Sequence, residues 1–188
     1  MHGYGGHDVM DANVEGLLQI SKGIVSTGVT SFLPTTLTDS VKKLSDACEN
    51  VGKCKNLCQG AKIQGIFLEG PFFTEKYKGA QNSKYMSNPS MEKLKSWNDI
   101  SGNLVNKIAI APEFEGTTDF IKEAVDLGVY VALAHSDATY EQAKEAVKSG
   151  ASIFVHTYNG MSPLHHRNPG MVGASLTTDT FNEVICDG

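Results

Sequence analysis

Short apolar runs of strand-forming residues alternate with amphipathic stretches along the chain. Two of these stretches, 117–128 and 139–150, place apolar residues at helical spacing and end on Gly, which commonly follows a helix. The apolar runs predict strands at 30–36, 63–70, 106–113, 130–135, 152–159 and 181–188. Strands that alternate with helices indicate about six βα units and a parallel sheet covered on both faces.

Polar side chains fall at or just after the ends of successive predicted strands. They are Glu69, Glu113, His135, His156 and Asn159. In a (β/α)₈ barrel all strand carboxyl ends meet at one face, where the active site is built. A doubly wound sheet also binds ligands at its strand ends, but along one crevice. Polar residues at this many strand ends favour the TIM (β/α)₈ barrel over the doubly wound sheet.

The chain has 188 residues, whereas a complete barrel needs about 250. It begins with the polar segment MHGYGG and stops at VICDG, where a loop should follow a strand. We therefore expect residues 1–188 to form a single catalytic-barrel fragment. In this interpretation it is a partial TIM barrel that lacks its first strand and its last barrel strands.

Composition narrows the range of partners. The formal charge of −5, with both signs interspersed, argues against nucleic acid or an anionic membrane as a partner. No apolar run approaches the roughly 20 residues of a membrane span. The four cysteines lack paired C-x-x-C units, so we expect reduced, structural thiols, which favours the cytoplasm.

Three of the polar strand ends suggest a metal centre. A barrel would bring Glu69, His135 and His156 toward one point, and one carboxylate with two imidazoles and an open position is a catalytic zinc pattern. Fe, Co or Mn would also suit imidazole ligands. Each histidine taken alone is more simply a structural residue, but the three together at matching positions predict a divalent metal. Such a metal would activate water and polarise a substrate carbonyl.

Six segments carry a resemblance to a known family. They read HGYGGHDVMDA, GVTSFLPTT, GIFLEGPFF…KGAQN, APE, AHSDATYEQA and HTYNGMSPLHHRNPG. In this order, and over essentially the whole chain, the sequence resembles N-acetylglucosamine-6-phosphate deacetylases of the amidohydrolase superfamily. LEGPF and H-x-YN-x-MSP-x-HHR-x-PG are specific as a pair, whereas APE and the Gly-rich start are weak alone.

The resemblance implies a metal-dependent hydrolase of a linear amide. Its reaction would convert N-acetylglucosamine 6-phosphate to glucosamine 6-phosphate and acetate, within cytoplasmic amino-sugar metabolism. The implied partner is a small amino-sugar phosphate, and the implied assembly of the full-length protein is a homodimer. Glu69, His135 and His156 match the family's metal ligands, and Ala80 and Gln81 match a substrate-contacting loop.

The segment HTYNGMSPLHHR supplies the remaining implied substrate contacts. Asn159 and Gly160 match the pair that meets the sugar phosphate. Arg167 matches the phosphate-binding arginine, which in this family can serve a neighbouring subunit. His165 and His166 match no functional residue, and we expect them to pack or cap the loop.

The two ends of the chain lack parts of the family pattern. His2 fits the second His of an H-x-H motif and is a possible ligand of a second metal, whereas His7 is expected in an exposed loop. The family's general acid and base is an Asp that we expect beyond Gly188. We interpret Asp137 as a residue that orients its loop, and we expect these 188 residues alone to be inactive.

Two alternatives remain open at this point. One is another amidohydrolase that acts on cyclic amides, but such substrates would not need Arg167. The other is a non-catalytic module that binds a sugar phosphate or a metal and has lost its base. A strand containing T-D after Gly188 would distinguish the enzyme from the binding module.

Overall fold

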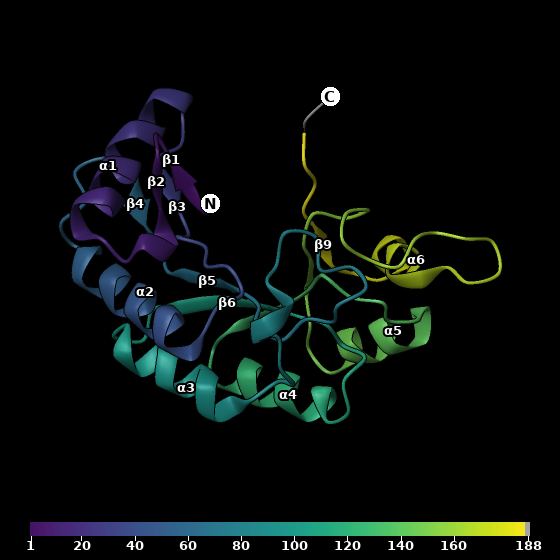
Figure 1. The fold of residues 1–188 in the computed structure, drawn as a ribbon. Coiled ribbons are helices and arrows are strands. Elements are labelled where there is room, and N and C mark those ends of the chain that lie inside the picture. The colour runs from purple at the N-terminus through teal and green to yellow at the C-terminus, as the bar shows by residue number, and fades with distance from the viewer. Residues whose placement is uncertain (187–188) are drawn as a thin grey trace. The chain divides into compact units, whose positions relative to one another are not determined.

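The computed structural model describes residues 1–186 of the chain (Figure 1). By their internal contacts the residues group into two compact units. The first comprises Met1–Glu69 and Glu92–Lys107, and the second comprises Gly70–Met91 and the chain from Ile108 onward. The prediction of a single barrel fragment over 1–188 stays a prediction. Within residues 1–186, no helix is long and apolar enough to cross a membrane.

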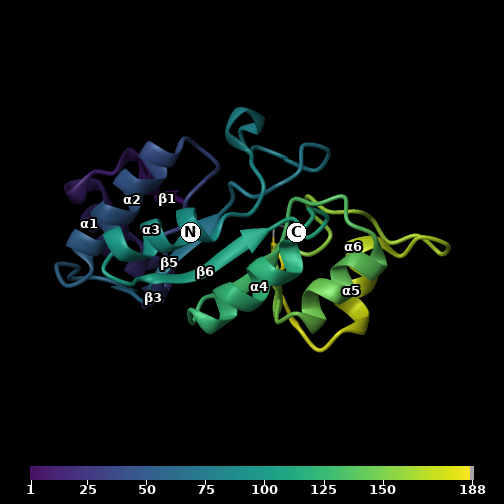
Figure 2. The same cartoon turned by 90° about the horizontal axis from the view of Figure 1, so that it is seen from below.

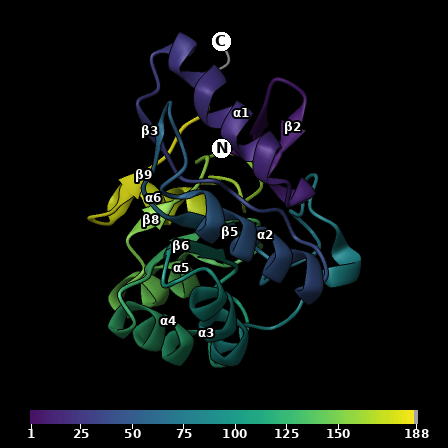
Figure 3. The same cartoon turned by 90° about the vertical axis from the view of Figure 1, so that its left-hand side faces the viewer.

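The first unit begins with a small antiparallel hairpin that lies beside a helix (Figure 3). Strand β1 (Gly3–Tyr4) pairs with β2 (His7–Asp8), and both contact helix α1 (Val14–Ile24). The next elements are the 3₁₀ turns η1 (Val9–Asp11) and η2 (Val25–Thr27), strand β3 (Ser31–Phe32), helix α2 (Val41–Cys54), and strands β4 (Lys62–Ile63) and β5 (Ile66–Glu69). β3 pairs with β4 in parallel.

Helices α1 and α2 pack against each other and supply much of the apolar core of the first unit. Each starts at a polar cap: Asn13 accepts a hydrogen bond from the Gly16 amide, and Ser40 accepts one from the Lys43 amide. Burial in α2 raises the pKa of the Cys48 thiol to about 12, so this thiol packs as an apolar group. Helix α3 (Met91–Ile100) follows later in the chain.

The second unit contains alternating helices and parallel strands. After β6 (Val105–Ile110) come α4 (Thr117–Asp126), β7 (Tyr130–Leu133), α5 (Tyr140–Lys148), β8 (Ile153–Phe154), α6 (Gly170–Thr177) and β9 (Phe181–Asn182). Strand β8 pairs in parallel with β7 and with β9. Helices α5 and α6 lie side by side (Figure 2). The 3₁₀ turn η3 (Ser83–Tyr85) lies in the long loop after β5.

The observed strands are shorter than several of the predicted apolar runs. Runs 130–135 and 152–159 contain β7 and β8, which end at Leu133 and Phe154, so both candidate histidines lie in loops. The run 181–188 contains only the two residues of β9, and its last residues, Asp187 and Gly188, lie outside the described part. The predicted helices at 117–128 and 139–150 correspond to α4 and α5.

Helix α5 begins with a reciprocal cap that gives a first testable prediction. The Thr139 hydroxyl accepts from the Gln142 amide at 3.2 Å, and the Gln142 side chain accepts from the Thr139 amide at 2.8 Å. Thr139→Ala should therefore lower the free energy of unfolding by about 1 kcal/mol in urea titrations. Thr118→Ala, which changes the same residue type inside α4, is the control. An equal decrease in the free energy of unfolding of both variants would contradict a specific role of the cap.

Candidate metal centre

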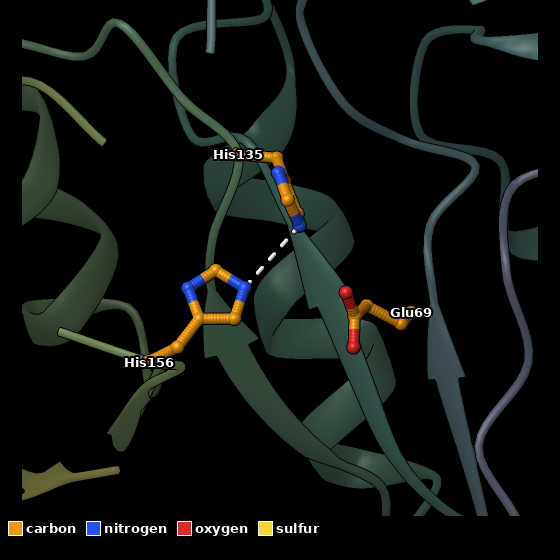
Figure 4. A group of neighbouring side chains, drawn as sticks. All are labelled: Glu69, His135 and His156. Carbon is orange, nitrogen blue, oxygen red and sulfur yellow. Dashed lines mark hydrogen bonds between the residues drawn. The ribbon is translucent and has the colours of Figure 1, made fainter. Parts of the chain in front are cut away.

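Three side chains at or just after the ends of strands β5, β7 and β8 point toward one another (Figure 4). Glu69 is the last residue of β5, and His135 and His156 each lie two residues beyond the end of a strand. Each side chain offers one ligand atom, and these atoms all lie within 4.8 Å of one another. The structure thus brings together the three residues that the sequence singled out as a carboxylate and two imidazoles.

The two imidazoles face each other through their Nε2 atoms, which are 3.3 Å apart, and the ring planes make an angle of 75°. Their Nδ1 atoms face backbone oxygens: the Tyr77 oxygen lies 3.0 Å from His135, and the Asn159 oxygen lies 2.9 Å from His156. A carbonyl oxygen only accepts hydrogen bonds, so each Nδ1 must carry a proton. In a neutral ring Nε2 then holds a lone pair, and two lone pairs that face each other at this distance can both coordinate one cation.

The spacing of these nitrogens fits a divalent metal. Two zinc–nitrogen bonds of about 2.0–2.1 Å at the tetrahedral angle place their nitrogens about 3.3–3.4 Å apart, close to the 3.3 Å observed. Metal-binding histidines commonly donate their second N–H to a backbone carbonyl, as both rings do here. The carboxylate of Glu69, which is 6% exposed, completes a mixed nitrogen and oxygen donor set.

The backbone around both histidines is unusual. His135, His156 and Tyr158 have φ angles of 45°, 36° and 79°, in the left-handed region that residues with a side chain seldom adopt. Such strained residues cluster at functional sites and persist only where the surroundings fix them. The Thr74 amide donates to the His135 oxygen, and the Phe73 ring packs on the His135 imidazole with centroids 4.7 Å apart.

His2 lies beside the carboxylate of the candidate centre. Its Nε2 is 3.3 Å from Oε2 of Glu69, and its Nδ1 is buried without a hydrogen-bond partner. The side chain of His2 is 39% exposed. This position is compatible with a ligand of a second ion next to Glu69, and that role stays a prediction.

The other predicted site residues occupy two loops. Ala80 is exposed and Gln81 is buried, with its amide donating to the Lys78 oxygen at 3.0 Å. Asn159 is exposed, and its oxygen holds the His156 ring. Gly160 has a φ of 60°, and a Cβ there would lie 3.0 Å from Nδ1 of His135. The loop therefore passes directly over this ring, where only a residue with little bulk fits.

Arg167 lies in a cleft of about 610 Å³ within the second unit. Lys76, Tyr140 and His165 also line this cleft. Arg167 is exposed, and its amide donates to Nδ1 of His165 at 3.2 Å. His165 and His166 are exposed, and their ring centroids are 4.3 Å apart. The guanidinium is thus open to a ligand or to another chain.

The sequence does not reveal how the two histidines are oriented. Tyr77 and Asn159 act through backbone oxygens, and any residue type offers such an oxygen. Thr74 also contacts the His135 loop, but a threonine in a loop has no distinctive signature. A positive φ at a histidine likewise has no sequence signal.

No protein-family model matches the chain. It is 45% identical to the N-acetylglucosamine-6-phosphate deacetylase of Vibrio furnissii, over 100% of this chain and 48% of that protein. It is 38% identical to the N-acetylgalactosamine-6-phosphate deacetylase of Escherichia coli O157:H7, over 100% of this chain and 50% of that protein. The chain therefore spans about half the length of the curated relatives it matches.

Solved structures of deacetylases also match the fold of this chain. The fold matches the N-acetyl-D-glucosamine-6-phosphate deacetylase of Mycobacterium smegmatis with a TM-score of 0.94 and 28% identity, over 100% of this chain and 49% of that chain. A variant of that enzyme was solved in complex with N-acetyl-D-glucosamine-6-phosphate. The predicted fold class, an α/β chain that fits part of a TIM barrel, is confirmed. Over its whole length the chain is a homologue of N-acetylglucosamine-6-phosphate deacetylases, the family indicated by its motifs.

Proposed function

We propose that this chain carries the metal-binding part of a deacetylase that hydrolyses the acetamide of N-acetylglucosamine 6-phosphate to glucosamine 6-phosphate and acetate. The observation that carries the proposal is the pair of Nε2 atoms 3.3 Å apart beside the Glu69 carboxylate. The similarity to deacetylases over the whole chain supports it. Because the chain spans about half the length of these relatives, the complete activity belongs to the full-length protein.

Glu69, His135 and His156 would hold a divalent ion, for which zinc is our first choice and Fe, Co and Mn are the alternatives. When bound, the ion supplies Lewis acidity that polarises a carbonyl and makes water a better nucleophile. The backbone oxygens of Tyr77 and Asn159 keep both Nδ1 atoms protonated and so direct both Nε2 lone pairs to the centre. In this proposal His2 would hold a second ion.

The phosphate and sugar would contact residues of two loops. Asn159 and Gly160 adjoin His156 and His135, so a ligand bound there would lie beside the candidate centre. Arg167 offers a guanidinium fork that suits a phosphate, and its exposure suits service to a second subunit of a homodimer. Ala80 and Gln81 would contact the sugar. We propose the cytoplasm as the location of this reaction.

The proton carrier would lie outside these 188 residues. Asp137 is a poor candidate because Lys76 lies 2.8 Å from each of its carboxylate oxygens, an arrangement that holds the loop instead. The general acid and base in this proposal is an Asp beyond Gly188. Neither a non-catalytic binding module nor a hydrolase of cyclic amides is favoured, because the relatives named above are deacetylases.

The direct test measures acetate released from N-acetylglucosamine 6-phosphate by the full-length protein loaded with zinc. We expect turnover that a chelator abolishes and added zinc restores. N-acetylgalactosamine 6-phosphate should be assayed in parallel, because the Escherichia coli relative is named for that sugar. Absence of acetate from both sugars, in a protein shown to bind zinc, would contradict the proposal and favour the binding module.

The 188-residue chain should be tested beside the full-length protein at equal metal loading. Loss of one general acid or base typically lowers a rate about 10²–10⁴-fold, so we expect the chain alone to be slower by at least this factor. A rate near that of the full-length protein would place the proton carrier within residues 1–188.

A further inference from the structure

Glu113 lies three residues beyond the end of β6 and is half-buried in the second unit. Its carboxylate accepts three hydrogen bonds. The Ser136 hydroxyl donates to Oε2 at 2.6 Å, the Asp137 amide donates to Oε1 at 2.8 Å, and the Thr74 hydroxyl also donates to Oε1. Hydrogen bonds to an ionised carboxylate are stronger than those between neutral groups. Glu113 therefore holds its neighbours firmly.

The three donors surround the backbone of His135. Ser136 and Asp137 directly follow this histidine in the chain. Thr74 approaches from the loop after β5, and its amide and hydroxyl lie 3.3 and 3.4 Å from the His135 oxygen. Glu113 thus joins the two segments that hold the peptide on the carboxyl side of His135. The φ of 45° at His135 needs such external support, because the side chain makes this conformation unfavourable.

The same network reaches the loop of the second histidine. The Ser136 amide donates to the Gly160 oxygen at 3.1 Å, and the Ser162 amide donates to the Ser136 oxygen at 3.0 Å. Gly160 follows Asn159, whose oxygen orients His156. Glu113 is therefore connected through Ser136 to the loop that sets the direction of His156.

We propose that Glu113 is a positioning residue for the metal centre. Among the residues that the structure describes, the candidate ligand group consists of Glu69, His135 and His156, so Glu113 acts through the backbone of His135. It fixes the left-handed conformation that aims Nε2 of His135 at Nε2 of His156. The inference rests on the proposed function, because it requires His135 to be a metal ligand.

The first test replaces Glu113 with Gln in the full-length protein. Glutamine keeps the length of the side chain, but its NH₂ group cannot accept the hydrogen bonds that one carboxylate oxygen receives. Changes to groups that orient metal ligands typically weaken metal binding 10–100-fold, and we expect a zinc affinity lower by about this factor in a chelator competition. The visible spectrum of the cobalt-loaded variant should also change, because it reports the ligand geometry.

Glu115→Gln is the matched control. Glu115 lies two residues further along the same loop, is exposed, and loses the same charge on substitution. The zinc affinity and the cobalt spectrum of the Glu115→Gln variant should equal those of the unmodified protein. An equal change in both variants would mean that the loss of a negative charge, and not the position of Glu113, affects the metal.

A second pair of variants covers the case in which Glu113→Gln does not fold. Thr74→Val removes one hydroxyl donor with little change of shape, whereas Thr74→Ser keeps that donor. We expect weaker zinc binding with Val and near-normal binding with Ser. In the double variant with both Glu113→Gln and Thr74→Val, the added threonine substitution should weaken zinc binding less than it does alone. The reason is that the two residues share one contact.

The outcomes separate this inference from the proposed function. If His135→Ala keeps its zinc, the proposed metal centre is wrong whatever Glu113 does. If His135→Ala loses zinc while Glu113→Gln keeps normal affinity and an unchanged cobalt spectrum, the positioning role is overturned. Should Glu113→Gln fail to fold, equal zinc affinities of Thr74→Val and Thr74→Ser would overturn it.

Discussion

Replacing His135 with Ala should remove most of the bound metal from a full-length protein that still folds. His135 is 7% exposed and would provide one of three ligands, with its Nε2 3.3 Å from that of His156. Loss of groups that only orient a ligand weakens metal binding 10–100-fold, so loss of the ligand itself should weaken it by more than about 10². Elemental analysis after dialysis should find zinc near zero, and acetate release should fall to background.

The control for this experiment is His166→Ala. His166 is exposed and lies in the same long loop as Arg167, so its loss should leave the zinc content unchanged. Circular dichroism must show that His135→Ala is folded, because the substitution also removes the contact with the Phe73 ring. A folded His135→Ala protein with normal zinc stoichiometry would disprove the assignment of this residue as a ligand.

Local patterns explain which elements the sequence predicts well. Stretches 117–128 and 139–150 correspond to α4 and α5 because their apolar residues recur at helical spacing and each helix is followed by a turn at Gly. No helical pattern predicts α6, because its sequence GMVGASLT has no polar face and its first six residues are buried. Only the surrounding structure can make such a segment helical.

The site shows the same division between local and long-range information. The candidate ligands could be identified because polar residues at the ends of apolar strands are unusual and because their motifs resemble a family. The predicted strands nevertheless extend too far at their carboxyl ends, since β7 and β8 end two residues before His135 and His156. The left-handed turns that follow depend on partners such as Thr74, 61 positions away in sequence, so no local pattern announces them.

Arg167 is the only arginine in the 188-residue sequence, and its replacement should separate phosphate recognition from the metal chemistry. The chain has a formal charge of −5, so a phosphate needs a local positive group. A bidentate, charge-assisted contact is worth about 1.5–3 kcal/mol. Arg167→Ala in the full-length protein should therefore lower kcat/KM for N-acetylglucosamine 6-phosphate about 10–150-fold.

Two comparisons make this prediction specific to the phosphate. Activity on unphosphorylated N-acetylglucosamine should be low in the parent protein and barely change in Arg167→Ala, because that sugar has no group for the guanidinium to bind. Arg167→Lys should lose less than Arg167→Ala, since it keeps the charge but not the planar fork. Zinc content should stay normal in both variants. Equal losses on the phosphorylated and unphosphorylated sugars would show that Arg167 supports the fold or the metal centre instead of the phosphate.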